Sequence, residues 1–465
     1  MTDLLYTAVS FLNPWICGWM IVGFLWPACP RMLRASLGVG LGLGLAGSIY
    51  MLSLLAMNSA LRAVTITEFL LLTSSAALFI RARLGRRIVP ASFPPLARSS
   101  KLATIALVLC GALGFSALAF MVDVSRHGGW DAVAIWNVKA RFFYLAERPA
   151  DVLKAVELSR SQLDYPVLLP SLVARGWQYA GRMTVLVPGA LAIVFTMATF
   201  VLAVAALRVL APGVDAMLGG CLLIGTPFFL RHGVSQYADI AMCLFVTAAV
   251  MLLSIASVRD AEAPRLRVLA GLFAGFAMCT KNEGLLFVLV LAVAQLGLAI
   301  RQGRATAAIR AGAAFGGGVI PGLLAFAIFK LLYSPPNQIV AGVTVDTAAA
   351  NLVDWPRHLK IITDLVREGR GFGEWWINPA PLLFIYFLGR YAVAPIRKLD
   401  EKWLLPGSVL VLMALGYYGI YLMSPYDVDW HIQTSLSRLI LQLWPTILMF
   451  YCLLLGGEKT SGGYP

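Results

Sequence analysis

Long apolar runs are the feature that most limits what this chain can fold into. Runs of roughly 18 or more apolar residues recur along the sequence, and a helix needs about 20 such residues to cross a bilayer. The runs are continuous and rich in Leu, Ala and Gly, whereas the strands of a membrane β-barrel alternate in short segments. With 60% hydrophobic and 13% charged residues, the chain is predicted to be an all-α polytopic membrane protein and not a soluble domain.

The apolar runs predict about thirteen transmembrane helices, joined by two long hydrophilic loops, 123–182 and 334–378, that lie on one face and bear short amphipathic helices. Three regions are expected: a three-helix region with a basic linker (1–101), a membrane core (102–456) and a short tail (457–465). The thirteen spans are predicted near residues 7–27, 35–57, 63–81, 102–122, 184–208, 214–230, 238–257, 266–280, 284–300, 311–333, 380–396, 403–422 and 437–456.

The basic residues predict how the chain is oriented in the membrane. The net charge of +14 would indicate nucleic acid as a partner in a soluble protein, but here most Lys and Arg residues gather in the short connections of one face. By the positive-inside bias this face is cytoplasmic. The N-terminus and both long loops are then outside, the C-terminus is inside, and no nucleic-acid partner is expected. The style of the motifs favours a bacterial inner membrane.

The cysteines give no sign of a metal site or a disulfide framework. All seven fall within or at the ends of apolar spans, and their spacing matches no metal-binding pattern. They are interpreted as small buried apolar residues.

The loop 123–182 holds the strongest candidate for chemistry, Asp131 in the motif Gly-Gly-Trp-Asp at 128–131, where the glycines let the chain turn out of the membrane. The stretch after it interleaves aromatic residues with Lys139 and Arg141, a composition typical of a helix in the headgroup zone. A carboxylate held there is partly desolvated and suited to act as a general base for an incoming hydroxyl. Capping of a helix by Asp131 is the alternative interpretation. Asp164, in the sequence Asp-Tyr-Pro later in the loop, could shape the side of the site that accepts the hydroxyl, but a turn explains it equally well.

Charged residues at two other predicted helix ends are further candidates. Asp239 lies where a span begins, and an ionisable residue there indicates a functional site unless it caps the helix. Lys281 and Glu283 lie between two apolar spans. They predict either a site for a charged headgroup or a simple ion pair, and the spacing does not separate the two.

The start of the last predicted span carries groups suited to phosphate. His431 and Arg438 are seven residues apart, so in a helix they share a face with Thr434 and Ser435. Two cations and two hydroxyls on one face predict a phosphate cradle. Arg438 as an anchor that snorkels to the membrane surface is the alternative.

Four short motifs carry a family resemblance: Gly-Trp-Asp-Ala at 129–132, Tyr-Ala-Asp at 237–239, Thr-Lys-Asn-Glu-Gly at 280–284, and the group at 430–438. In their order and common outer placement they resemble the GT-C superfamily of integral-membrane glycosyltransferases. That group includes the dolichyl-phosphate-mannose protein mannosyltransferases and bacterial relatives that use polyprenyl-phosphate sugars. The resemblance covers roughly residues 102–456.

The resemblance implies a reaction and roles for the candidate residues. A sugar would pass, with inversion, from a polyprenyl-phosphate donor to a hydroxyl of a glycan, lipid or protein acceptor, beside membrane lipid. Asp131 would be the catalytic base, and Asp239 would help to bind the acceptor or a metal. Many relatives pair two acids in the first loop, whereas Ala132 follows Asp131 here, so no cofactor is certain and a divalent metal stays open. The residues expected to bind substrate are Lys139, Lys281, Glu283, His431 and Arg438.

Two other functions compete with the transferase. A secondary transporter would place ionisable residues near the bilayer midplane, at broken helices, and would often show repeated halves. Nearly all charges here lie at the ends of predicted spans, and only Glu68 stands inside one. This placement favours the enzyme, while a lipid-carrier flippase or an assembly partner in an envelope pathway stays open.

Overall fold

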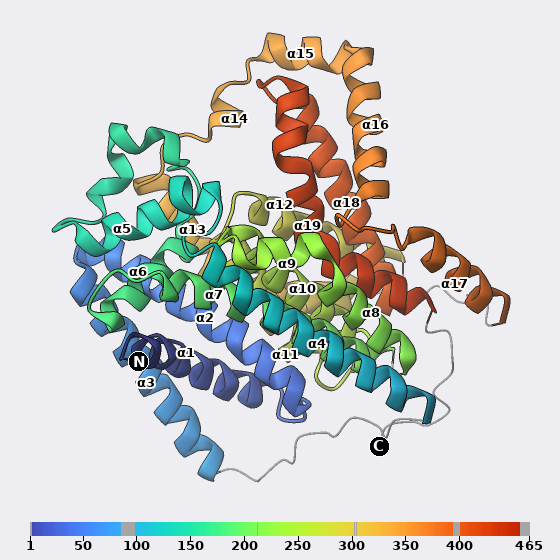
Figure 1. Ribbon diagram of the computed structural model, residues 1–465, viewed down its shortest axis with the longest axis horizontal. Coiled ribbons are helices and arrows are strands. Elements are labelled where there is room, and N and C mark those ends of the chain that lie inside the picture. The colour runs from blue at the N-terminus through green and yellow to red at the C-terminus, as the bar shows by residue number, and fades with distance from the viewer. Residues whose placement is uncertain are drawn as a thin grey trace.

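The computed structural model describes residues 2–84, 98–211, 213–301, 303, 305–393 and 400–455. Every regular element in these ranges is a helix (Figure 1), which confirms the predicted all-α class. The predicted basic linker, 88–100, lies outside the described residues except for its last three positions. The predicted tail, 457–465, lies wholly outside them.

Ten helices of the described ranges are long and apolar enough to cross a membrane, and we treat the chain as an integral membrane protein. Each corresponds to one of the predicted spans. They are α1 (Thr2–Leu25), α2 (Arg31–Met57), α3 (Ala60–Leu84), α4 (Arg98–Val124), α7 (Leu186–Leu210), α10 (Ala238–Ala256), α12 (Glu283–Arg301), α13 (Ala305–Leu332), α18 (Glu401–Met423) and α19 (Val428–Leu455).

The predicted count of thirteen spans is not confirmed, because three predicted segments differ from a simple crossing helix. The segment 214–230 is two helices, α8 (Val214–Gly225) and α9 (Pro227–Val234), bent by 57°; counted as one span, this pair gives eleven. α11 (Ala263–Met278) has 16 residues and α17 (Ala380–Val393) has 14. Both are shorter than the roughly 20 residues that a bilayer requires. Apolar composition shows neither where a helix bends nor how much of an apolar run is helical.

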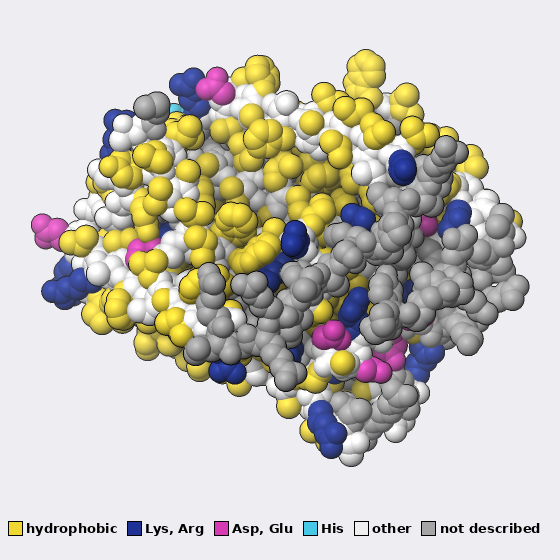
Figure 2. All heavy atoms as spheres, turned by 90° about the horizontal axis from the view of Figure 1, so that it is seen from below, with side chains coloured by type: hydrophobic (Ala, Val, Ile, Leu, Met, Phe, Trp, Pro, Cys, Tyr) yellow, Lys and Arg dark blue, Asp and Glu magenta, His cyan; other side chains and the backbone are white. Residues whose placement is uncertain are grey.

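Hydrophobic side chains cover much of the molecular surface, as Figure 2 shows for one face. Among them, Leu61, Phe120 and Leu331 on spanning helices are 69%, 71% and 82% exposed. Apolar surface on this scale is unfavourable in water and expected in lipid.

α10 is the central helix of the bundle. It is surrounded by α7, α11, α18 and α19 (Figure 1), and all of its apolar span is buried. Asp239, in its first turn, is therefore enclosed by protein from the start of the helix. A carboxylate buried in this way must find hydrogen-bonding and charged partners on neighbouring helices.

Small residues let α11 and α13 pack backbone to backbone. Gly271 and Gly275 of α11 face Gly318 and Gly322 of α13, and a Cβ added to Gly318 would lie 2.1 Å from the carbonyl oxygen of Val268. Small residues four apart on both helices are the pattern that allows close contact in membranes. This contact fixes the direction of α13, whose last turns carry Lys330 toward the first long loop.

The two long loops lie at the same end of the bundle, which we call the loop end, and both are largely helical. A hydrogen bond from Phe228 N to Gly373 O (3.1 Å) and an ion pair between Arg231 and Glu374 attach the second loop to α9. In Figure 1 the second loop passes over the upper ends of α18 and α19, and its last helix runs beside α18. The loop helices are η1 (Ala132–Trp136), α5 (Asn137–Leu145), η2 (Asp151–Lys154), η3 (Val156–Ser161) and α6 (Leu168–Ala180) in the first loop, and α14 (Gln338–Ala341), α15 (Val345–Val353) and α16 (Trp355–Gly371) in the second.

The first three helices are attached to the rest of the chain through a buried ion pair. Arg175 of α6 donates from Nε to Glu68 of α3 (2.7 Å) and from Nη1 to the carbonyl oxygen of Ser10 of α1 (2.7 Å). Asn13 of α1 also donates to Glu68, at 2.5 Å. The one acid that the sequence places inside a span therefore has a structural partner.

Candidate functional site

The turn before Asp131 packs closely against the segment that precedes α10. Gly128 has a φ of +72°, and Gly129 N donates to the carbonyl oxygen of Ser235 (3.0 Å). A Cβ on Gly129 would lie 2.3 Å from the hydroxyl of Tyr237, so a larger residue would push the two segments apart. The backbone N–H of Asp131 donates to that same hydroxyl at 3.3 Å. The Gly-Gly turn therefore places Asp131 beside the start of α10.

The side chain of Asp131 does not cap the helix that follows it. It makes no capping hydrogen bond, and a π-helical turn, η1, begins at the next residue. Its Oδ2 instead lies 2.7 Å from Nη1 of Arg438, which comes from α19 more than 300 positions later. π-Helical turns such as η1 are often found near functional sites.

Arg438 bridges Asp131 and Asp239. Its Nε and Nη2 both contact Oδ2 of Asp239, at 2.9 and 2.8 Å, and its guanidinium carbon lies 4.9 Å from the ring centre of Tyr237. Arg438 is only 21% exposed, so it does not snorkel to the membrane surface. Since a guanidinium is planar and always charged, it fixes both the distance and the orientation of the two carboxylates.

Asp239 is fully buried, and both of its oxygens have partners. Oδ1 accepts from Nζ of Lys281 (3.1 Å) and from Nε2 of Gln442 (2.8 Å), and Lys281 also pairs with Glu283 at 2.9 Å. Burial by itself would lower the pKa of Lys281, but the carboxylates of Asp239 and Glu283 raise it above its usual value. Lys281 therefore stays charged.

Five of the seven residues chosen from the sequence thus lie in one set of ion pairs, which we call the acid–cation network. Neither Asp131 nor Asp239 caps its helix. Lys281 and Glu283 do form an ion pair, and the same lysine extends it to Asp239. The network consists of Asp131, Asp239, Lys281, Glu283 and Arg438.

Lys139 lies outside the network. Its side chain is fully buried, and Nζ donates to the carbonyl oxygen of Gln162 at 2.6 Å. Nζ lies 5.9 Å from the ring centre of Tyr165, whose ring is also 5.8 Å from Nζ of Lys281. Burial lowers the pKa of Lys139 to about 7, although Asp164 opposes the shift. Lys139 is thus close to the network but has no direct bond to it.

His431 also lies apart from the network. Its Nδ1 bonds to the hydroxyl of Ser424 (2.8 Å), and its ring packs on Tyr421. Thr434 and Ser435 donate their hydroxyls to carbonyl oxygens of their own helix, at 2.8 and 2.5 Å, as these residues often do in helices. Among the described residues, no hydrogen bond joins His431 to Arg438. The four groups of the predicted cradle share a helix but do not converge.

Asp164, which the sequence offers either as a residue that shapes the acceptor side or as part of a turn, is a second polar centre. It is 2% exposed, and its Oδ2 accepts from the amides of Asn282 and Asn337, both at 2.8 Å. Lys330, at the end of α13, donates to its backbone carbonyl. Oδ1 is buried and has no partner among the described residues. The Asp-Tyr-Pro sequence at 164–166 is typical of a turn, and only the fold brings the three partner segments to it.

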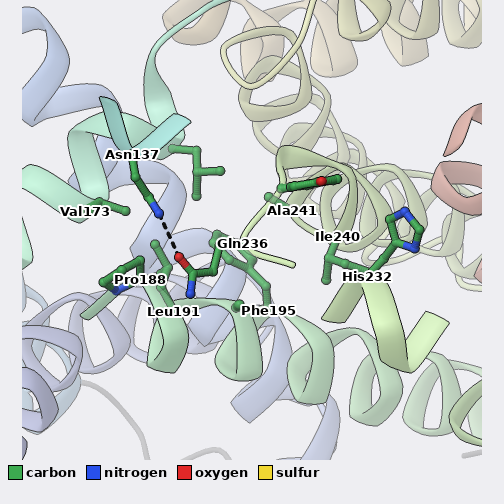
Figure 3. Close-up of a pocket in the computed structure, with 12 residues that line it drawn as sticks. Asn137, Val173, Pro188, Leu191, Phe195, His232, Gln236, Ile240 and Ala241 are labelled. Carbon is green, nitrogen blue, oxygen red and sulfur yellow. Dashed lines mark hydrogen bonds between the residues drawn. The ribbon is translucent and has the colours of Figure 1, made fainter. Parts of the chain in front are cut away.

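Two hollows adjoin the network. The smaller, a cavity of about 10 Å³ shown in Figure 3, has Tyr237 in its lining, and the hydrogen bond from Asn137 Nδ2 to Gln236 Oε1 (2.7 Å) crosses that lining. A larger pocket of about 290 Å³ shares Asn137, Gln236 and Pro188 with that cavity and lies at the loop end. Gln236 connects the larger pocket to the network, because the next residue, Tyr237, contacts both Asp131 and Arg438.

Within the part of the chain that the structure describes, no three His, Cys, Asp or Glu side chains are grouped so that they could hold a metal ion. The comparisons with protein-family models, with curated proteins and with solved structures found no match for this chain. Its function is therefore inferred from the geometry and chemistry of the site.

Proposed function

We propose that this protein is an integral-membrane glycosyltransferase that moves a sugar from a polyprenyl-phosphate donor to an acceptor hydroxyl at the membrane surface. The observation that carries the proposal is the setting of Asp131. Its carboxylate is 18% exposed, lies seven residues after the end of spanning helix α4, and is held in place by Arg438. It is thus an accessible, oriented acid near the depth at which lipid headgroups lie.

In the proposed reaction, the oxygen of the acceptor hydroxyl attacks the anomeric carbon of the donor sugar. Its proton passes to the carboxylate of Asp131 as the new C–O bond forms. The bond between the anomeric carbon and the phosphate oxygen breaks, and the lipid phosphate leaves with that electron pair. Attack from the face opposite the leaving group inverts the anomeric centre.

The pairing of Asp131 with Arg438 suits this kind of reaction. The planar guanidinium holds the carboxylate of Asp131 in one orientation. Glycosyl transfer passes through an oxocarbenium-like transition state, in which the attacking hydroxyl becomes strongly acidic only as the new bond forms. A well-oriented base is sufficient for such a step. Asp239, Lys281 and Glu283 act by fixing Arg438, and no step requires them to contact the sugar.

We place this chemistry on the outer face of the membrane, because the short connections rich in Lys and Arg lie at the other end of the spans. The style of the motifs favours a bacterial inner membrane. The acceptor is a hydroxyl of a glycan, a lipid or a protein.

The test is to incubate purified full-length protein with a panel of polyprenyl-phosphate sugars and acceptors and to measure release of the polyprenyl phosphate. Asp131→Asn keeps the shape of the side chain but removes the base, so we expect turnover to fall by about 10²- to 10⁴-fold. Asp151→Asn is the matched control, because Asp151 is a half-exposed acid of the same loop, paired with Arg148. Unchanged release by Asp131→Asn, in protein with the thermal stability of the parent chain, would rule out the assigned base.

A secondary transporter is the second candidate, and the break between α8 and α9 favours it. Broken helices form the substrate sites of many transporters, and this pair bends by 57°. Against it, the acid inside a span, Glu68, is held by Arg175 and Asn13. Reconstituted vesicles distinguish the two: uptake of a sugar or lipid-linked sugar without release of polyprenyl phosphate would support the transporter.

A further inference from the structure

The cations of the acid–cation network are already bonded to carboxylates. Arg438 contacts Asp131 and Asp239, and Lys281 contacts Asp239 and Glu283. Three carboxylates stand against two cations, so a phosphate entering there would meet an excess of negative charge. A departing phosphate must nevertheless be stabilised by fixed donors. The donors that stabilise the departing phosphate must therefore come from side chains outside the acid–cation network.

The pocket of about 290 Å³ at the loop end, which we call the loop-end pocket, has such donors. The residues of its lining that matter here are Arg126, His127, Asn137, Arg141, Trp177 and Gln236. Its volume is at the lower end of the range of small-molecule sites, roughly 300–1,000 Å³. It is large enough for a phosphate with part of an attached group.

Two of the three side chains of this pocket that can carry a positive charge have no hydrogen-bond or ion-pair partner among the described residues. Arg126 pairs with Asp123 (2.8 Å), whereas neither Arg141 nor His127 makes a hydrogen bond or ion pair with another described residue. Both are exposed. The guanidinium fork of Arg141, a lining residue of the pocket, is therefore free to bind a ligand, and its geometry best matches phosphate oxygens.

The position of the pocket indicates a lipid as the source of the phosphate. Arg126 and His127 come two and three residues after the end of α4, and the lining residues 183–185 directly precede α7. Both spans therefore end at the depth of the pocket. Phe120 and Val124, in the last turns of α4, are 71% and 68% exposed and would face hydrocarbon. A lipid packed along α4 would carry its headgroup to the level of Arg126.

We propose that the loop-end pocket binds the phosphate group of a membrane lipid, with Arg141 and His127 as its principal ligands. The inference rests on the proposed function in one respect, since a polyprenyl-phosphate donor would place its phosphate there. Gln236 accepts a hydrogen bond from Asn137 of the same pocket, and the next residue, Tyr237, accepts one from the backbone N–H of Asp131. These two residues would connect the phosphate site to Asp131.

The inference is tested by binding, without turnover, using full-length protein in detergent and three probes: a polyprenyl monophosphate, the corresponding polyprenol and inorganic phosphate. We expect the lipid phosphate to bind most tightly. Arg141→Gln should weaken its binding by about tenfold or more, since a charge-assisted hydrogen bond is lost. Arg148→Gln, which removes an exposed arginine of the same loop outside the pocket, should bind like the parent chain.

Equal affinity for the polyprenol would overturn phosphate recognition, and inorganic phosphate binding as tightly as the lipid would overturn the lipid assignment. Unchanged affinity in Arg141→Gln would remove the pocket as the site. The readout is independent of catalysis: binding that depends on Arg141 in a protein that transfers no sugar would uphold this inference and reject the transferase. Sugar transfer by Arg141→Gln with an unchanged KM for the donor would uphold the transferase and reject the loop-end pocket as the phosphate site.

Discussion

At the scale of single residues, Arg438 determines how the site is arranged. Among the described residues, Arg438 forms ion pairs with both Asp131 and Asp239, acids that are 108 positions apart in the sequence. Replacing it would leave Asp239, which is fully buried, with only Lys281 and Gln442 as partners. Loss of one member of a buried ion pair is strongly destabilising. Asp131, whose side chain is partly exposed, is therefore the cleaner position at which to test catalysis.

Lys139 gives a prediction about pH. Its pKa falls from 10.5 to about 7 on folding, so between those pH values the unfolded chain binds more protons than the folded chain. The free energy of unfolding then rises with pH across this window, by at most about 1.4 kcal/mol per pH unit, and the cost of burying the charge is greatest below pH 7. Lys139→Met removes this titration, so the Tm of the parent chain minus the Tm of the variant should increase from pH 7 to pH 10.

Thermal unfolding in detergent, followed by intrinsic fluorescence at several pH values, measures this difference. Lys154→Met is the control, because Lys154 is an exposed lysine of the same loop. Its profile should run parallel to that of the parent chain. A Lys139→Met profile that is also parallel would contradict a lowered pKa for Lys139.

At the scale of elements, the bundle depends on close helix contacts that place the ends of α12 and α13 near the first loop. Lys330, in the last turn of α13, donates to the backbone carbonyl of Asp164. Asn337, which follows α13, and Asn282, just before α12, donate to the carboxylate of Asp164. The packing of α13 on α11 sets where these groups arrive. A change in the packing of α13 on α11 would therefore move the side chains that contact Asp164 at the loop end.

Gly318→Ala tests this crossing. The new Cβ would lie 2.1 Å from the carbonyl oxygen of Val268, a backbone atom that can move only if the helices separate. We expect a loss of about 1–3 kcal/mol of stability, seen as a lower Tm in detergent. Gly317→Ala is the matched control, since no atom lies within 4 Å of its Cβ position and alanine favours the helix. Equal Tm values for the two variants would show that the contact is not tight.

At the scale of the whole molecule, the apolar surface and the two loops define a membrane protein whose candidate site lies at one end. The acid–cation network, Asp164 and the loop-end pocket all lie at the loop end, built from the ends of α4, α10, α12, α13 and α19. The side of the membrane on which this end lies decides which substrates can reach it. The distribution of Lys and Arg predicts the outside.

Cysteine labelling in intact cells tests the orientation. Arg148 lies in the first long loop with a side chain that is 75% exposed, and Asp260 is exposed in the connection between α10 and α11 at the other end. We expect Arg148→Cys to react with a membrane-impermeant maleimide in intact cells, and Asp260→Cys to react only after permeabilisation. The parent chain, with seven free cysteines inside or at the ends of helices, sets the background. The opposite pattern would place the site in the cytoplasm.

The sequence by itself determined the class of this protein, because hydrocarbon-length apolar runs leave few alternatives to spanning helices. It located ten of the spans and proposed five of the residues that meet in the network, since a charge at the end of an apolar run demands a partner. The count of thirteen spans is not confirmed, because composition does not show that α8 and α9 bend or that α11 and α17 have only 16 and 14 helical residues in the described ranges.

Only the tertiary structure decided which of these groups meet. Arg438 and His431 look alike as cations on one helix face, yet Arg438 turns to two acids and His431 bonds to Ser424. Asp164, an ordinary turn residue in the sequence, gains three partners from distant segments. These outcomes depend on helix crossings such as that of α11 and α13, and on the burial of α10, which forces Asp239 to find its partners within the protein. Long-range packing of this kind leaves no signal in local spacing.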